Sequence, residues 1–450
     1  MFVLRLHQRI KIKRILNIAI PSGLQSAFDM LSMGIALFFL GNISPLNFTA
    51  LGVGANYIIV FYPLSAIFGI GTNVLMSRRY GATNYTEMNI VYSTMSYAAS
   101  IFSLPVLFLA FACLSFYLHT FNLSEELYSL TYSYVSLTLF AIPAIMIKNV
   151  LISGFAATGD TKRPFYIKIV LTCFSILGYF IFIDGKFGFP ALELRGAAYV
   201  TLIISYLELF ILSLLPYFVK TQLKLIIQFQ WKFLISALKV GIPTGIERTF
   251  SILALNVVLI FVGQYANMYG DSAMTGFQAG TKIEGFSFVP GFGFMVAVMS
   301  LVGQSIGAKN YKLADEYTKL SATIASILLG ICGIILAVFA KPLSDIFIQQ
   351  DFVAVQISIV YLLAVGLSQT PLILCFVYDG ALRGAGYTQI PLLINIISIS
   401  VFRLVPMWIC SSFAMSLYIL FLIIFLETYI RAVIFYWIFK SGIWKKPKEL

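Results

Sequence analysis

Apolar residues are grouped along this chain into long runs that are separated by short polar breaks. About twelve such runs occur, each close to the ~20 residues that a helix needs to cross a bilayer. Because backbone polar groups must be paired within the hydrocarbon, we expect each run to form a membrane-spanning helix. The predicted spans lie near residues 15–40, 48–76, 90–118, 128–158, 165–184, 196–219, 236–265, 272–303, 319–340, 353–383, 390–410 and 414–440.

Three short phrases occur twice, in the same order, about half the chain apart. They are Ile20–Gly23 and Ile242–Gly245, Gly81–Tyr85 and Gly307–Tyr311, and a Gly-x-Thr-x-x-Pro pattern at 159–164 and 386–391. Ordered repeats of this kind indicate a duplicated unit. Each copy holds about six spans, an even number, so both copies begin on the same membrane face and form a parallel repeat.

The pattern predicts an all-α integral membrane protein with twelve transmembrane helices in two parallel-repeat six-helix bundles around a central cleft. We expect an N-terminal bundle at 1–219, a basic cytoplasmic linker at 220–239 and a C-terminal bundle at 240–450. Tandem halves in a hydrophobic chain are typical of transporters, whose substrate path runs between the repeats.

The repeated phrases fall at predicted cytoplasmic hairpins. Gly159 and Gly386 can end a helix, because glycine tolerates the left-handed conformation. Pro164 and Pro391 can begin the next helix, because proline has no amide hydrogen to leave unpaired. We therefore expect these phrases to shape turns and not to contact a substrate.

Composition supports the membrane assignment and limits the function. Hydrophobic residues make up 60% of the 450 positions and charged residues only 11%, while the formal net charge is +12. Of the 30 lysines and arginines, 22 fall in segments that are cytoplasmic if the N-terminus is cytoplasmic, Lys168 among them. This bias predicts a multi-pass protein of the plasma (inner) membrane with both termini in the cytoplasm. It leaves no basic soluble domain for nucleic acid.

The sequence motifs do not indicate an enzyme. The five cysteines stand singly in apolar runs, without metal-ligand spacing. No Gly-x-x-x-x-Gly-Lys-Ser/Thr phrase is present to bind ATP. We expect no enzyme activity, no catalytic residue, no bound metal and no cofactor other than a coupling ion, H⁺ or Na⁺.

Acidic residues inside the spans are the candidate functional groups. An ionised side chain at the centre of a span costs ~2.5–3.5 kcal/mol on insertion scales, so each one retained there needs a role. The intramembrane acids are Asp29, Glu208, Glu247, Glu284, Asp379 and Glu427. We assign four of them to cation or substrate binding: Asp29, Glu247, Glu284 and Asp379.

The repeat relates Asp29 to Glu247. Asp29 follows Pro21 by eight residues and Glu247 follows Pro243 by four, so the two acids project from matching helix faces, one turn apart. Asp29 has no basic neighbour in sequence, which favours a functional role.

Structural ion pairs are the alternative for the other acids. Glu247 has Arg248 and Lys282 as possible partners, and Lys282 also stands two residues before Glu284. Asp379 with Arg383, and Glu427 with Arg431, have the four-residue spacing of a local helical pair. Glu208 has no partner in sequence and remains unassigned.

Three longer motifs resemble the multidrug and toxic compound extrusion (MATE) family. They are GQSIGA at 303–308, GALRGAG at 380–386 with Thr388 and Pro391, and IEGFSFVPGFG at 283–293. The resemblance implies two six-helix bundles facing a central cavity, and export of cationic amphipathic compounds in exchange for sodium ions or protons.

The first half departs from the family pattern in two places. It has Ser77, Arg78 and Arg79 where the family usually has Gly-Gln before the first Gly-Ala phrase. Ala36 occupies the position of an aspartate that many bacterial members carry, five residues before Gly41. The usual sodium site of the first bundle is therefore not expected in its usual form.

The leading functional hypothesis is a secondary active antiporter that exports small organic cations by alternating access. A carboxylate in low dielectric gains proton affinity and, while ionised, attracts cations, so substrate and coupling ion compete. We expect an organic cation at Asp29 and Glu247, membrane lipid around the protein, and a monomer. The alternative is a flippase for a lipid-linked saccharide precursor, which belongs to the same superfamily and would need a cavity rich in Arg and Lys.

Overall fold

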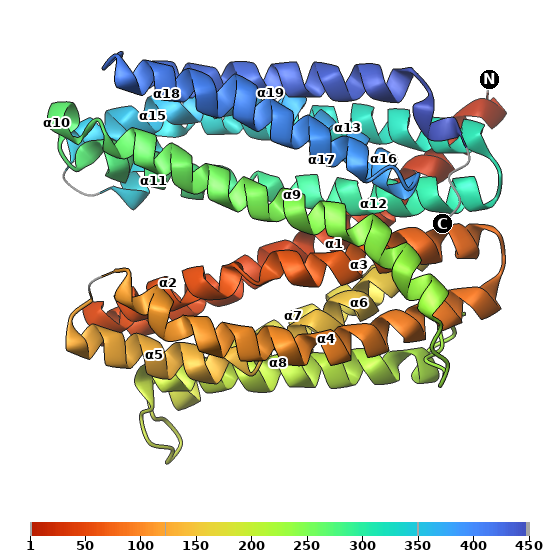
Figure 1. Cartoon of the computed structure of the whole chain (residues 1–450), viewed down its shortest axis with the longest axis horizontal. Helices are drawn as coiled ribbons and strands as arrows, with labels where there is room; N and C mark the ends of the chain where they lie inside the picture. The colour runs from red at the N-terminus through yellow and green to blue at the C-terminus, as the bar shows by residue number, and fades with distance from the viewer. Residues whose placement is uncertain (1, 122, 349–350, 447–450) are drawn as a thin grey trace. The chain divides into compact units, whose positions relative to one another are not determined.

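The computed structural model describes residues 2–121, 123–348 and 351–446, in which every regular element is a helix (Figure 1). The helices of the first half are α1 (Phe2–Ile43), α2 (Pro45–Ile59), α3 (Tyr62–Gly81), α4 (Tyr85–His119), α5 (Glu125–Leu139), α6 (Ile142–Thr158), α7 (Lys162–Phe182) and α8 (Glu193–Phe218). Those of the second half are α9 (Trp231–Gly263), α10 (Ala266–Tyr269), α11 (Ser272–Gly285), α12 (Phe288–Gly307), α13 (Tyr311–Val338), α14 (Ala340–Phe347), α15 (Phe352–Leu367), α16 (Gln369–Gly384), α17 (Gln389–Ile397), α18 (Val405–Ser412) and α19 (Leu417–Lys440). A π-helical segment, Ser398–Leu404, joins α17 to α18, and a short 3₁₀ turn, Ile443–Lys445, follows α19.

The membrane-spanning pattern is confirmed. Within the described ranges, nine helices are long and apolar enough to cross a membrane, and the number rises to twelve when three bent helix pairs each count as one span. The bent pairs are α2 with α3, α5 with α6, and α15 with α16, at angles of 44°, 44° and 51°. The protein is therefore an all-helical, multi-pass membrane protein.

Proline accounts for the breaks in the bent pairs. Pro63 and Pro143 are the second residues of α3 and α6, and Pro371 lies in the first turn of α16. Proline removes one backbone donor and its ring clashes with the carbonyl of the preceding turn, so a helix bends or restarts there. The hydropathy pattern predicts continuous spans at these places because it does not register such a break.

The phrase at Gly81–Tyr85 and Gly307–Tyr311 forms the same turn in both halves. Asn84 and Asn310 cap α4 and α13, and their side-chain oxygens accept hydrogen bonds from the Glu87 and Leu313 amides at 3.1 and 3.0 Å. The residues just before these caps, Thr83 and Lys309, have left-handed φ values of 58° and 55°. The expectation that this phrase shapes a turn is confirmed.

The Gly-x-Thr-x-x-Pro phrase, at 159–164 and 386–391, ends a helix in both halves. Gly159 follows α6 with φ of 88°, and Gly386 lies just past the end of α16 with φ of 79°. The next amides, of Asp160 and Tyr387, donate back to the Phe155 and Leu382 carbonyls at 3.0 and 2.9 Å. This pairing satisfies the last carbonyls of each helix, and only glycine adopts the required conformation without a Cβ penalty.

The chain divides into two compact units at equivalent points of the repeat. One unit is Leu24–Gly245, and the other joins the chain up to Gly23 with the chain from Ile246 onward. Gly23 and Gly245 end the two copies of the Ile-Pro-Ser/Thr-Gly phrase. This division differs from the expected one, 1–219 and 240–450 around a linker at 220–239. The part of α1 up to Gly23 belongs to the unit that begins again at Ile246, and the part of α9 up to Gly245 belongs to the unit that begins at Leu24.

The first turns of α9 lie against α3 within the Leu24–Gly245 unit. A Cβ at Gly71 would meet the Ala237 carbonyl oxygen at 2.6 Å, and a Cβ at Gly241 would collide with the Ile67 carbonyl. A Cβ at Gly245 would meet the Ile67 side chain. Glycine is thus required at this crossing, because any side chain would separate the two helices.

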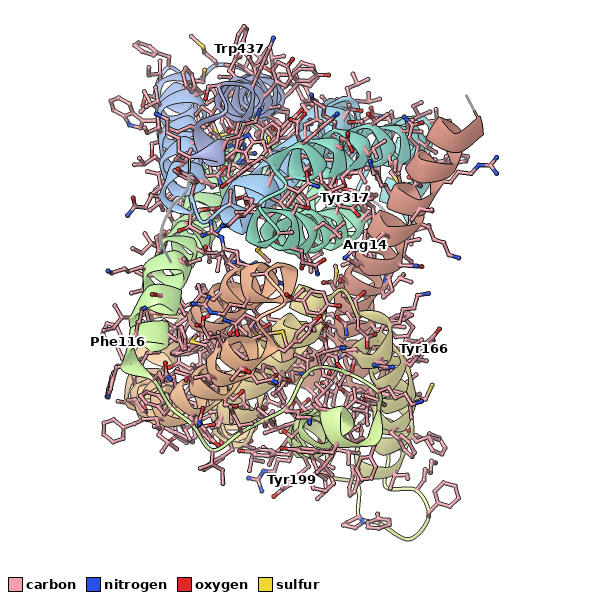
Figure 2. The ribbon with its side chains drawn as sticks, turned by 90° about the vertical axis from the view of Figure 1, so that its right-hand side faces the viewer. Arg14, Phe116, Tyr166, Tyr199, Tyr317 and Trp437 are labelled. Carbon is pink, nitrogen blue, oxygen red and sulfur yellow. The ribbon has the colours of Figure 1, made fainter. Side chains whose placement is uncertain are left out.

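The first turns of α1 make the equivalent crossing with α12 in the other unit. A Cβ at Gly23 would meet the Val289 carbonyl oxygen at 2.8 Å, and a Cβ at Gly293 would collide with the Ala19 carbonyl. Arg14 holds the same segment in place, since its Nη2 donates to Gln304 Oε1 at 2.7 Å. Its guanidinium also lies 6.0 Å from the centre of the Tyr317 ring (Figure 2).

The linker after α8 is an extended segment attached to α4. The Ile226 amide donates to Ser93 Oγ at 2.8 Å, and the Gln230 amide donates to Thr94 Oγ1 at 3.2 Å. Asn89 donates to the Gln222 carbonyl at 3.0 Å. The segment is therefore part of the Leu24–Gly245 unit, and the expected linker is shortened at its C-terminal end because α9 begins at Trp231.

Candidate functional site

The Leu24–Gly245 unit contains a cavity of about 190 Å³. Its walls come from α1, α2, α3, α5, α6, α7 and α8. Four charged side chains line it, Asp29, Lys148, Lys168 and Glu208. The remaining walls are largely aliphatic, with tyrosine rings and small hydroxyl side chains between. A small apolar cavity with a few convergent charged groups is the usual form of a small-molecule site.

The four charged groups form one continuous chain of ion pairs. Lys168 Nζ lies 2.5 Å from Asp29 Oδ1 and 3.7 Å from Glu208 Oε2. Lys148 Nζ donates to the same Glu208 oxygen at 2.6 Å. Acids and bases alternate along the chain, so every charge has an opposite neighbour, which burial of ions requires.

Asp29 is the exposed end of this chain. The side chain of Asp29 is 61% exposed, whereas those of Lys168 and Glu208 are 10% and 3% exposed. Ala36, two turns further along α1, lines the same cavity. The carboxylate that the family resemblance places at position 36 is therefore absent, but Asp29 supplies one from the same helix to the same cavity.

Glu247 and Asp379 meet in the other unit, on a shared arginine. Arg383 Nη2 lies 2.5 Å from Glu247 Oε2, and Arg383 Nε lies 2.5 Å from Asp379 Oδ1. Asn395 Nδ2 donates to the second Glu247 oxygen at 2.8 Å. The local pair expected for Asp379 is present. Glu247 takes Arg383, from α16, as its ion-pair partner in place of the expected Arg248 or Lys282.

Glu427 lies at the centre of a neighbouring buried network. Its Oε1 is 3.2 Å from Arg431 Nε, as the four-residue spacing predicts, and accepts a hydrogen bond from Ser398 Oγ at 2.8 Å. Arg403, from the π-helical segment, pairs with its other oxygen. Arg431 Nη1 also donates to Asn395 Oδ1 at 3.5 Å and so joins this network to Glu247.

Glu284 has its hydrogen-bond partner outside both groups. Its Oε2 accepts a hydrogen bond from the Tyr361 hydroxyl at 2.5 Å, which connects α11 to α15. Its interaction is thus with a tyrosine and not with the lysine two residues before it. Among the described residues, no group of three or more His, Cys, Asp or Glu side chains is placed to hold a metal ion.

The structure therefore brings together some of the expected site residues and separates others. Glu247 and Asp379 share Arg383, Glu284 stands apart, and Asp29 belongs to the other unit with partners that were not expected. Lys148 was identifiable as an intramembrane charge, whereas Lys168 counted as a cytoplasmic one because only a few residues precede it in its span. For neither lysine did the sequence predict which acid it pairs with.

Comparison with known proteins agrees with these features. The MatE family model matches residues 21–181 and 243–409, the two halves of the repeat. The probable multidrug resistance protein NorM of Thermotoga maritima is 26% identical over 447 residues, which cover 97% of this chain and 94% of that protein. The probable multidrug resistance protein YoeA of Bacillus subtilis is 25% identical over 66% of this chain and 65% of its own length.

Solved structures show the same fold. An outward-facing multidrug resistance MATE transporter of the MOP superfamily superposes with a TM-score of 0.90 over 97% of both chains, at 18% identity. The family model, the relatives and the fold agree with the resemblance seen in the motifs. The chain belongs to the multidrug and toxic compound extrusion (MATE) family of membrane transporters.

Proposed function

We propose that the protein is a secondary active exporter. It moves amphipathic compounds with a positively charged group out of the cytoplasm, in exchange for protons or sodium ions, and opens to one side of the membrane at a time. Membership of the MATE family and relatives named as probable multidrug resistance proteins support this proposal.

The observation that carries the proposal is the exposed carboxylate of Asp29 in a membrane-embedded cavity. Lys168 is its ion-pair partner, and the side chain is otherwise largely open. A cationic substrate group, a proton and a sodium ion all bind a carboxylate, and one carboxylate cannot hold two of them at full strength. Binding of the coupling ion at Asp29 therefore weakens the hold on the substrate, which is the requirement for exchange.

Glu247 and Asp379 remain predicted cation-binding residues, but Arg383 now occupies the place of an external cation. Arg383 already pairs with both carboxylates, each at 2.5 Å. An external cation can take its place only if Arg383 moves or the carboxylates separate. We therefore assign the main exchange site to Asp29, with the arginine network as a support for the helices of the other unit.

The distribution of lysines and arginines supports the proposed location and orientation of the protein. We place the protein in the plasma membrane with both termini in the cytoplasm, because most lysines and arginines then fall on the cytoplasmic side. We propose that the monomer is the working unit, since the cavity lies within one chain. The flippase alternative is disfavoured, because the two cavity lysines are matched by two acids and leave no excess positive charge for an anionic headgroup.

Transport by purified protein in vesicles tests the proposal. Uptake of a panel of amphipathic amines, ethidium included, is measured under a proton gradient alone and under a sodium gradient alone. We expect one gradient to drive uptake, and Asp29→Asn to abolish that drive. Asp160→Asn is the matched control, because Asp160 pairs with Arg163 at a helix connection outside the cavity. Uptake by Asp29→Asn at the control rate would refute the proposal.

A further inference from the structure

The connection between α8 and α9 displays large apolar side chains that the rest of its unit leaves uncovered. Ile227 is 97% exposed, Phe218 is 81% exposed and Trp231 is 69% exposed. Apolar surface is stabilised by removal from water, so a segment surrounded by water gains nothing from this display. The arrangement calls for a partner that covers these side chains.

A three-residue turn places Ile227 at its tip. The Gln228 amide donates to the Ile226 carbonyl at 2.9 Å, which is the hydrogen bond of a γ-turn. On both sides of the tip the backbone is tied to α4, because the Ile226 and Gln230 amides donate to hydroxyl side chains of that helix at 2.8 and 3.2 Å. The tip is therefore held outward by a fixed backbone.

The contacts on α4 give the depth of this tip in the membrane. The hydroxyl groups that hold it belong to Ser93 and Thr94. Helix α4 begins at Tyr85, and a rise of ~1.5 Å per residue puts Ser93 about 12 Å from that end. The apolar run of α4 begins near residue 90. The tip thus lies where the span passes from the hydrocarbon to the headgroups.

The same connection carries positive charge that no nearby acid in the sequence balances. Its exposed lysines, with those of the first turns of α9, are Lys220, Lys224, Lys232 and Lys239. No Asp or Glu occurs from 209 to 246. Lysines interleaved with exposed aromatic and aliphatic side chains are the pattern of segments that lie on anionic bilayer surfaces.

We propose that residues 218–232, here called the α8–α9 strap, bind the anionic lipid surface of the membrane. Ile227 and Trp231 enter the boundary between headgroups and acyl chains, and Lys224 and Lys232, which flank them, bind lipid phosphates. Tryptophan suits this depth because its ring is apolar while its N–H still reaches polar groups. The strap thereby holds the start of α9 at the membrane surface. This role is independent of the transported compound and of the coupling ion.

Quenching by lipid measures the position of the tip. A genetically encoded, environment-sensitive fluorescent amino acid replaces Ile227 in the full chain, reconstituted in vesicles of phosphatidylcholine and phosphatidylglycerol. Lys312 is the matched control position, because it is exposed in the first turn of α13, the helix equivalent to α4. We expect lipids brominated on their acyl chains to quench the label at 227 much more strongly than the label at 312. Quenching at 227 no stronger than at 312 overturns the proposal and leaves the tip for a protein partner.

Removal of the flanking charges tests the preference for anionic lipid. Wild type and the double variant Lys224→Gln/Lys232→Gln are titrated in detergent with phosphatidylglycerol or phosphatidylcholine, and bound lipid is counted by native mass spectrometry. Each lysine near an anionic surface contributes roughly fivefold in affinity, so the half-saturating concentration of phosphatidylglycerol should rise at least about tenfold. That of phosphatidylcholine should not change.

The matched control for this titration is Lys309→Gln/Lys312→Gln. It removes the same charge from exposed positions of a repeated hairpin that displays no large exposed apolar side chain at 307–312. We expect the control to bind phosphatidylglycerol as wild type does. Unchanged binding by the strap variant, or an equal loss in the control, contradicts the proposal.

Discussion

Arg383 and Glu247 are joined across a long stretch of sequence, with Arg383 Nη2 2.5 Å from Glu247 Oε2 and both side chains buried. The same guanidinium holds Asp379. Two carboxylates from different helices thus share one cation that belongs to the protein. In this unit, the position expected for an external cation is filled by an arginine.

Arg383→Ala is expected to destabilise the protein strongly. It leaves two buried carboxylates without their cation, and loss of one partner from a buried pair costs about 3–5 kcal/mol. Thermal unfolding of the purified protein in detergent measures the effect. Adding Glu247→Gln and Asp379→Asn should recover much of the loss. Arg163→Ala, which breaks a more exposed pair, should cost under about 1 kcal/mol. Equal melting temperatures for Arg383→Ala and Arg163→Ala would contradict the structural role of Arg383.

The two helix caps of the repeated phrase should contribute equally to stability. Asn84→Ala and Asn310→Ala each remove one side-chain acceptor from the start of a helix, a loss of about 1 kcal/mol. Denaturation midpoints of the two variants can be compared directly. The control is Asn256→Ala, since Asn256 is exposed and bonds a carbonyl of its own helix. A large difference between the two cap variants would show that the halves do not share this turn.

The crossing of α9 with α3 should not tolerate a side chain. Gly71→Val places its Cβ within 2.6 Å of the Ala237 carbonyl oxygen, so the helices must separate or the protein must misfold. We expect a severe loss of folded protein by size-exclusion chromatography. Gly34→Val is the matched control, because a Cβ there meets nothing within 4 Å. Normal yield of folded Gly71→Val would refute the close crossing.

Asp351 should make stability depend on pH in acid. It caps α15 outside the spans, and hydrogen bonds from the Ala354 amide and the Ser272 hydroxyl hold its pKa below the usual value. A pKa lower in the folded than in the unfolded state stabilises the protein above the unfolded pKa. That contribution is lost as pH falls through the folded pKa. Between pH 6 and pH 3, the difference in melting temperature between wild type and Asp351→Asn should therefore shrink. A difference that stays constant would contradict this role.

The spans and repeated turns were predictable because their causes are local. Hydrophobic run length indicates a membrane helix, and Gly159 and Gly386 end helices through their own backbone conformation. Short-range ion pairs were also accessible, as Asp379 with Arg383 and Glu427 with Arg431 show. In each case, the partners lie within one turn of the same helix.

The partners of Asp29 and Glu247 could not be predicted in the same way. Lys168 and Arg383 approach them from helices far along the chain, and only helix packing decides which charges meet. The sequence offered one indirect signal. Glu208 and Lys148 are opposite charges, each alone in its span, and a buried charge needs an opposite neighbour. The unit boundaries at Gly23 and Gly245 depend likewise on a crossing that hydropathy does not register.

Competition at Asp29 can be measured most directly by substrate binding to purified protein at increasing concentrations of the coupling ion. For wild type, we expect the affinity for substrate to fall as proton or sodium concentration rises. For Asp29→Asn, we expect weak binding that no longer responds to the ion. The same ion dependence in Asp29→Asn as in wild type would place the exchange site elsewhere.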